Sequence, residues 1–169
     1  GSKMNAGEAG LIMLIQPLMM ALMSPVAGRL SDHHEPRLLA TGGVIITAIG
    51  LLVLAGLPHQ NGAVPSALGL LLVGVGFGLF SAPNFNAVMS SVGSRDMASA
   101  GAIFSTARVM GQLMGMANIA LVFALGPVLL AGDQIQFVKV SFLLGFVFCL
   151  PALSFSYYRG NVRSGPERE

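Results

Sequence analysis

The sequence has very little charge. Asp, Glu, Lys and Arg together make up 9% of its 169 residues, and hydrophobic residues make up 54%, whereas an ordinary soluble domain is roughly 25% charged. A soluble fold would have to bury helices that are hydrophobic on every side, which the surface-to-volume relation disfavours for a chain of this size. The composition therefore predicts an integral membrane protein.

The sequence also lacks the marks of several functional classes. Its single cysteine, Cys149, cannot form an intramolecular disulfide. It has no basic patch interleaved with aromatic residues, which argues against a nucleic-acid partner. It has no phosphate-binding glycine loop, no CxxC pair and no nucleophile with a base at a fixed offset. We therefore expect neither an enzyme nor a bound cofactor.

One polar cluster could suggest a metal site. Asp32, His33, His34 and Glu35 follow one another in the sequence. Four consecutive residues of a short loop cannot all converge on one ion. We interpret the cluster as a solvated loop and expect no metal.

Long apolar runs are what the sequence has in abundance. Five of them are long enough to cross a bilayer, near residues 9–27, 38–57, 64–90, 98–127 and 137–158. A helix needs about 20 apolar residues to cross the ~30 Å hydrocarbon layer. Because the runs are continuous and do not alternate, they favour helices over a barrel. The predicted fold class is all-α, a polytopic membrane protein with about five transmembrane helices.

The chain divides into three parts around these runs. Residues 1–3, Gly-Ser-Lys, look like a cloning scar ahead of Met4. The transmembrane helical domain covers residues 4–158, and residues 159–169 form a polar tail.

The loop charges predict the orientation. The loops that share a side with the tail, together with the tail itself, carry nearly all the cationic loop residues: Arg29, Arg37, Arg95, Arg159, Arg163 and Arg168. The opposite loops, 58–62 and 127–136, contain no Lys or Arg. By the positive-inside rule the C-terminus is cytoplasmic and the N-terminus external. An odd number of spans that begins outside suggests that further chain precedes this one.

Small residues recur within the spans at four-residue spacing. Gly74 and Gly78 share one helix face, and so do Gly111 and Gly115. Without a hydrophobic force between helices in lipid, such faces let backbones approach closely and gain dispersion contacts. We expect these four glycines to serve helix packing.

Arg108 is the most informative single residue. It lies about 15 Å along the helix if that span begins near residue 98. An Arg at the bilayer centre costs roughly 2.5 to 3.5 kcal/mol, so it should face a cavity or a partner. The alternative is that this long run enters the membrane later and leaves Arg108 at the interface.

Other polar side chains occur at membrane depth, and each either lines a cavity or bonds a neighbouring helix. The candidates are Gln16, Asn84, Asn86 and Gln112. The expected spans contain no Asp or Glu. A proton-coupled carrier needs a buried carboxylate or His, so any proton site would have to lie elsewhere.

Three sequence blocks resemble a known family. Residues 28–37, GRLSDHHEPR, resemble the GxLxDxxGxR loop signature of the major facilitator superfamily, in the copy found in its C-terminal half. Residues 83–89, PNFNAVM, and 98–101, ASAG, followed by Arg108 to Gly111 and Gly115, resemble drug:proton antiporters with fourteen spans. The order and spacing of the blocks fit, and the resemblance covers almost the whole chain.

The resemblance implies a place for the chain and roles for its loop residues. The five spans would be the eighth to twelfth helices of a twelve-helix core in the cell (inner) membrane, part of a six-helix half-bundle whose partner is an N-terminal half. Gly28, Asp32 and Arg37 would form a cytoplasmic latch, in which Asp32 contacts a neighbouring helix end. Arg37 would pair across the domain interface and stabilise the outward-facing state. The sequence departs from the signature at Glu35, where the family usually has Gly.

Two functions remain open from the sequence. The first is the C-terminal part of a secondary transporter that exports drugs or other small molecules, such as lipophilic cations, in exchange for protons by alternating access. The second is a transport-inactive membrane module that associates with itself or with another chain through its glycine-rich faces.

Overall fold

The computed structural model describes residues 6–33, 35–56, 63–129 and 134–158, and within these ranges all regular structure is helical. The helices are α1 (Ala6–Met13), α2 (Ile15–His33), α3 (Pro36–Gly56), α4 (Ala63–Ser90), α5 (Met97–Leu129) and α6 (Gln134–Tyr158). The residues expected to form a cloning scar and a tail lie outside the described residues.

The all-α membrane fold class is confirmed. Five stretches are long and apolar enough to cross a membrane: Gly7–Ser31, Arg37–Gly56, Val64–Ser90, Met97–Gly126 and Gln136–Ser154. The first of them joins α1 and α2. Pro17 has no N–H to donate to the carbonyl of Met13, and α1 ends at Met13. The chain is helical again from Ile15.

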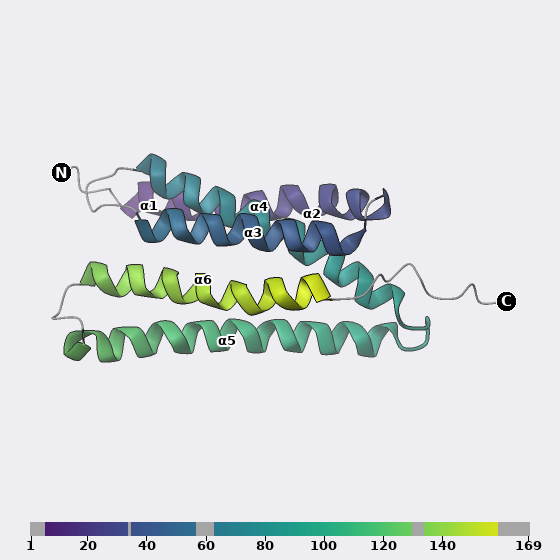
Figure 1. Cartoon of the computed structure of the whole chain (residues 1–169). Helices are drawn as coiled ribbons and strands as arrows, with labels where there is room; N and C mark the ends of the chain where they lie inside the picture. Colours follow the sequence, from purple (N-terminus) through teal and green to yellow (C-terminus); the bar gives the residue numbers. More distant parts are fainter. Residues whose placement is uncertain (1–5, 34, 57–62, 130–133, 159–169) are drawn as a thin grey trace.

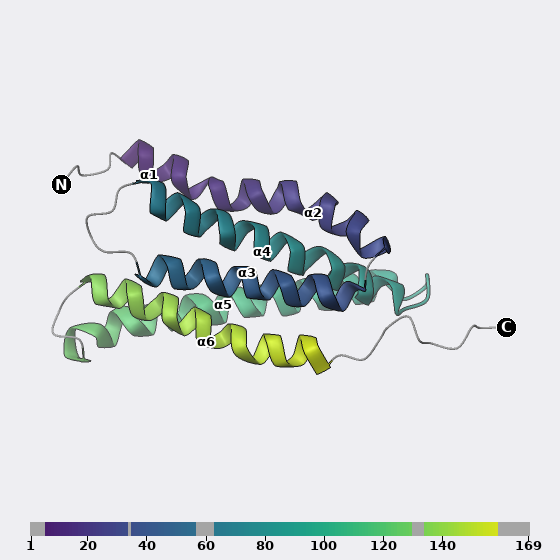
Figure 2. The same ribbon diagram turned by 45° about the horizontal axis from the view of Figure 1, so that its top comes forward.

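Helix α4 packs against both α2 and α3. It lies between α2 and α3, and α6 packs on the other side of α3 (Figure 2). Helix α5 runs alongside α6 at the edge of the molecule (Figure 1). Contacts thus link α2, α4, α3, α6 and α5 in turn, and α5 also contacts α4.

Small side chains dominate the packed interior. The buried apolar residues are Ala27, Ala40, Val44, Ala48, Ala55, Ala87 and Phe137, and Pro83 is fully buried within α4. Many large apolar side chains are exposed instead, among them Ile103 at 71% and Met114 at 69%. Close packing through small residues, with large apolar groups facing outward, is the arrangement that lipid surroundings favour.

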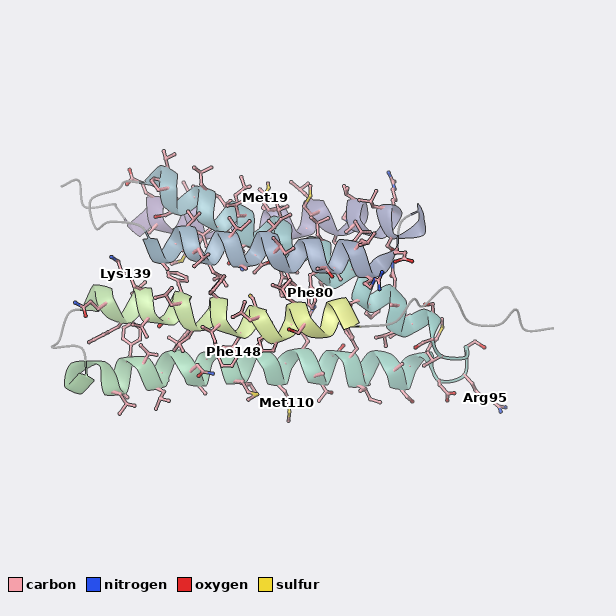
Figure 3. The ribbon with its side chains drawn as sticks, in the orientation of Figure 1. Met19, Phe80, Arg95, Met110, Lys139 and Phe148 are labelled. Carbon is pink, nitrogen blue, oxygen red and sulfur yellow. The ribbon has the colours of Figure 1, made fainter. Side chains whose placement is uncertain are left out.

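Helix α5 is attached near its two ends. Near its start the rings of Phe85 and Phe104 meet edge to face, with centroids 5.4 Å apart. Near its other end Phe123 and Phe137 make a similar contact at 5.8 Å. Every residue from 105 to 117 is exposed, and Figure 3 shows Met110 pointing away from the other helices. The middle of α5 is therefore uncovered by the described part of the chain.

The ends of the bundle differ in charge. The α2–α3 connection and the turn between α4 and α5 lie at the same end (Figure 1). Arg29 in the last turns of α2, Arg37 at the start of α3 and Arg95 in the turn therefore share that end. Figure 3 shows Lys139 near the opposite end from Arg95. The cytoplasmic location of the arginine-bearing end stays a prediction.

Candidate substrate cavity

A groove lies where α5 leaves α4 and passes α2. It encloses about 670 Å³, which falls within the 300–1,000 Å³ typical of small-molecule sites. Its walls come from three helices: Met20, Ala21, Ser24, Pro25 and Gly28 of α2, Ser81, Ala82, Phe85 and Asn86 of α4, and Phe104 and Arg108 of α5. An apolar wall with a few polar groups is the usual composition of a ligand site.

Arg108 supplies the one charge among these lining residues. It lies about 17 Å along the helix axis from Met97, the first residue of α5. Glu8, Arg29, Arg37 and Lys139 lie much nearer to an end of their helices. Arg108 is exposed, and among the described residues it makes no hydrogen bond or ion pair.

Phe104 determines where Arg108 lies. The two residues are four apart on α5 and therefore occupy the same helix face. Because Phe104 packs edge to face on Phe85 of α4, this face of α5 turns toward α4. The contact brings Arg108 to the same groove as Ser24, Ser81 and Asn86, whose hydroxyl and amide groups can both donate and accept hydrogen bonds.

The other predicted polar candidates are distributed differently. Asn86 lines the groove, and Asn84 is half-buried and has an interaction partner. Gln112 is exposed one turn beyond Arg108 and does not line the groove. Gln16 lies at the contact between α2 and α4, where its backbone carbonyl faces Gly74. The structure brings Asn86 and Arg108 together and leaves the other three outside the groove lining.

The predicted latch residues lie at the arginine-bearing end. Gly28 lines the groove, and Asp32 is at the end of α2. Arg37 Nη2 lies 3.4 Å from Glu35 Oε2. Glu35, which stands where the family usually has Gly, therefore pairs with Arg37. The latch role of these residues stays a prediction.

The glycines of α4 contact two different helices. A Cβ at Gly74 would lie 2.5 Å from the Gln16 carbonyl oxygen, and one at Gly78 would lie 2.8 Å from Cβ of Met23, both on α2. Gly76 points the other way and meets α3. Residues two apart in a helix face nearly opposite sides, and this alternation lets α4 pack closely on both neighbours.

Gly111 and Gly115 have open space around them. Nothing among the described residues lies within 4 Å of a Cβ built at either position. Gly115 lines a second cavity of about 430 Å³ between α3, α5 and α6. That cavity is almost wholly apolar, and its Asn118 donates to the Met114 carbonyl of its own helix at 2.9 Å. The packing role of these two glycines stays a prediction.

Sequence reasoning missed several residues that build the groove and its support. Ser24, Ser81, Phe85 and Phe104 line it, and Gly43 on α3 holds α4 in place. The usable signal for Phe104 was its position four residues before Arg108. A serine or a phenylalanine in an apolar run carries no comparable signal, because the sequence does not reveal which face of a span meets another helix.

The comparison with protein families decides the assignment. The model of the major facilitator superfamily matches residues 2–168. The chain belongs to the major facilitator superfamily. With its five helices long and apolar enough to cross a membrane, the chain is a multi-pass membrane protein of this superfamily.

Two curated relatives agree with this assignment. The chain is 35% identical over 114 residues to the uncharacterized transporter YebQ of Escherichia coli (strain K12), which covers 68% of the chain and 25% of that protein. It is 30% identical over 116 residues to the riboflavin transporter RibZ of Clostridioides difficile (strain 630), which covers 69% of the chain and 25% of that protein. The chain thus matches about a quarter of the length of each relative. No solved structure matches it significantly.

Proposed function

We propose that this chain is the C-terminal part of a proton-coupled exporter of small molecules that works by alternating access. The groove between α2, α4 and α5 carries the proposal, because it combines apolar walls with Arg108, Asn86 and two serines. In this proposal the groove is one wall of a central cavity. The opposite wall comes from an N-terminal half, and rocking of the two halves exposes the cavity to each side in turn.

The exposed middle of α5 supports the presence of such a partner. The exposed stretch 105–117 includes Val109, Met110, Leu113 and Met114, each at least half exposed. Contact with another helical bundle would cover these side chains and close the groove. We propose that the carrier lies in the inner membrane with its C-terminus in the cytoplasm, as the arginine-bearing end predicts.

The coupling ion and the substrate are also proposals. Among the described spans, Glu8 in the first turn of α1 is the one Asp or Glu, and Asp32 lies just past the first span at the end of α2. The proton would therefore be carried by the N-terminal half. The resemblance to fourteen-span drug:proton antiporters suggests lipophilic cations as cargo, and the likeness to a riboflavin transporter suggests a planar heteroaromatic compound.

Reconstitution tests the proposal. The chain is placed in proteoliposomes alone and together with a candidate N-terminal half, and efflux of rhodamine 123 and of riboflavin is followed under an imposed pH gradient. We expect efflux only with both parts and only with the gradient. Efflux from the chain alone would contradict the proton assignment, and no efflux in either case would favour a transport-inactive membrane module.

A further inference from the structure

We propose that the groove between α2, α4 and α5 binds an organic anion, with the Arg108 guanidinium as the counter-ion of a carboxylate or another negative group on an aromatic molecule. This inference rests on the proposed carrier function and specifies its substrate class. The charge of the groove supports it. Among the lining residues that the structure describes, Arg108 is the one charged residue and none is Asp or Glu, and Arg108 makes no ion pair within the described part of the chain.

The depth of Arg108 strengthens its effect on a ligand. Once the proposed N-terminal half covers the groove, Arg108 lies in a partly buried site, where two charges attract several times more strongly than in water because the effective dielectric constant is lower. The planar guanidinium can also donate two parallel hydrogen bonds to a carboxylate. The same field repels a cation, so the lipophilic cations that the family resemblance suggests are less favourable occupants of this groove than an anion.

The remaining walls suit an aromatic body. Phe85 and Phe104 present an edge-to-face pair beside the arginine, and Met20 adds a deformable apolar surface. Ser24, Ser81 and Asn86 can bond carbonyl or ring-nitrogen groups. A molecule with a flat aromatic core and one negative group would match each of these features.

A thiol reporter tests the charge without knowledge of the ligand. Ser24 is exposed and lines the groove, so Ser24→Cys is introduced into the full-length carrier after Cys149→Ser and removal of any other cysteine. Its reaction rates with an anionic and a cationic methanethiosulfonate reagent are compared. We expect the anionic-to-cationic rate ratio to fall roughly tenfold in Arg108→Gln, as loss of a nearby charge in low dielectric requires, and to be retained in Arg108→Lys.

Arg95→Gln is the matched control. Arg95 is exposed in the α4–α5 turn, so this substitution removes the same charge at a position away from the groove. It should leave the ratio unchanged. An unchanged ratio in Arg108→Gln would overturn the proposal, since it would mean that a carboxylate such as Asp32, or one of the N-terminal half, already neutralises Arg108.

A second measurement needs no variant. Equilibrium binding of fluorescein and of rhodamine 123, an anion and a cation with the same xanthene core, is measured on the wild-type carrier without a pH gradient. We expect fluorescein to bind the more tightly, by about tenfold or more. Equal or tighter binding of rhodamine 123, or no binding of fluorescein, would overturn the proposal. Because no gradient is applied, this result is independent of whether protons drive transport.

Discussion

Gly43 of α3 and Gly76 of α4 lie backbone to backbone where the two helices cross. A Cβ at Gly43 would lie 2.6 Å from the carbonyl oxygen of Gly76, and a Cβ at Gly76 would lie 2.6 Å from the carbonyl oxygen of Gly43. Thr47 lines the same contact and donates its hydroxyl to the Gly43 carbonyl at 2.9 Å. The backbone of neither helix can yield, so this crossing fixes the position of α4 and with it one wall of the groove.

Gly43→Val should therefore destabilise the protein by about 1 to 3 kcal/mol, the usual cost of overpacking. The neighbouring Gly42 has nothing within 4 Å of a built Cβ, so Gly42→Val carries the same change in helix propensity without the clash. Thermal unfolding in detergent, followed by loss of the monodisperse peak, compares the two. Equal losses of stability in the two variants would contradict this backbone-to-backbone crossing.

Substitutions of the glycines in α4 and in α5 should have different effects on stability. Gly78→Leu places a large side chain against Met23 of α2 and should lower stability by roughly 1 to 3 kcal/mol. Gly115→Leu projects into the apolar cavity, where its Cβ has nothing within 4 Å, and should be neutral or stabilising. Melting of the isolated chain provides the comparison. A greater loss for Gly115→Leu would mean that α5 packs differently from the arrangement in Figure 1.

Arg108→Ala should impair transport by the full-length carrier while leaving membrane insertion intact. The residue is exposed to the groove and its removal breaks no ion pair within the described chain. Removal of a charge from a helix interior makes insertion easier by up to about 3 kcal/mol. Efflux rate and the amount of protein in the membrane are measured together, with Arg95→Ala as the control. Unchanged efflux in Arg108→Ala would refute a role in transport.

The loop at the end of α2 should influence the balance of the two carrier states. Glu35→Gly removes the partner of Arg37 and frees the arginine to pair across the domain interface, which the family resemblance associates with the outward-facing state. The ion pair is partly exposed and contributes up to about 1 kcal/mol. The ratio of outward-facing to inward-facing carriers should therefore rise by roughly fivefold or less. Accessibility of cavity cysteines reports the shift.

Asp32→Asn is expected to shift the same balance, because the family resemblance places Asp32 against a neighbouring helix end. It removes a charge at the end of α2 without altering the length of the side chain. The same cysteine accessibility assay applies. A pattern identical to that of the wild-type carrier would show that Asp32 does not participate in the conformational equilibrium.

The fold class was predictable from the sequence because the signal is compositional. Apolar runs of 19 to 30 residues admit few structures other than spanning helices in lipid. The break between α1 and α2 and the start of α3 at Pro36 also follow from proline chemistry. The family resemblance was carried by residues 28–37 and by the blocks around Pro83 and Arg108, which have a fixed order.

The pairing of helices was not predictable in the same way. Gly74 and Gly111 both begin a four-residue glycine repeat, yet only Gly74 meets another helix among the described residues. A glycine repeat shows that close approach is possible but not which helix approaches. Likewise, Asn84 and Asn86 are equally polar in sequence, and only the rotation of α4 against α2 and α5 places Asn86 in the groove. These facts depend on tertiary packing.

Substrate protection of two cysteines tests the central claim most directly, that the groove between α2, α4 and α5 is the substrate cavity. Ser81→Cys lines this groove, and Ser141→Cys lines the apolar cavity between α3, α5 and α6. Each is labelled in the full-length carrier with a thiol reagent, with and without a xanthene dye that the carrier transports. The account predicts that the dye slows labelling at Ser81→Cys alone. Protection at Ser141→Cys and none at Ser81→Cys would contradict it.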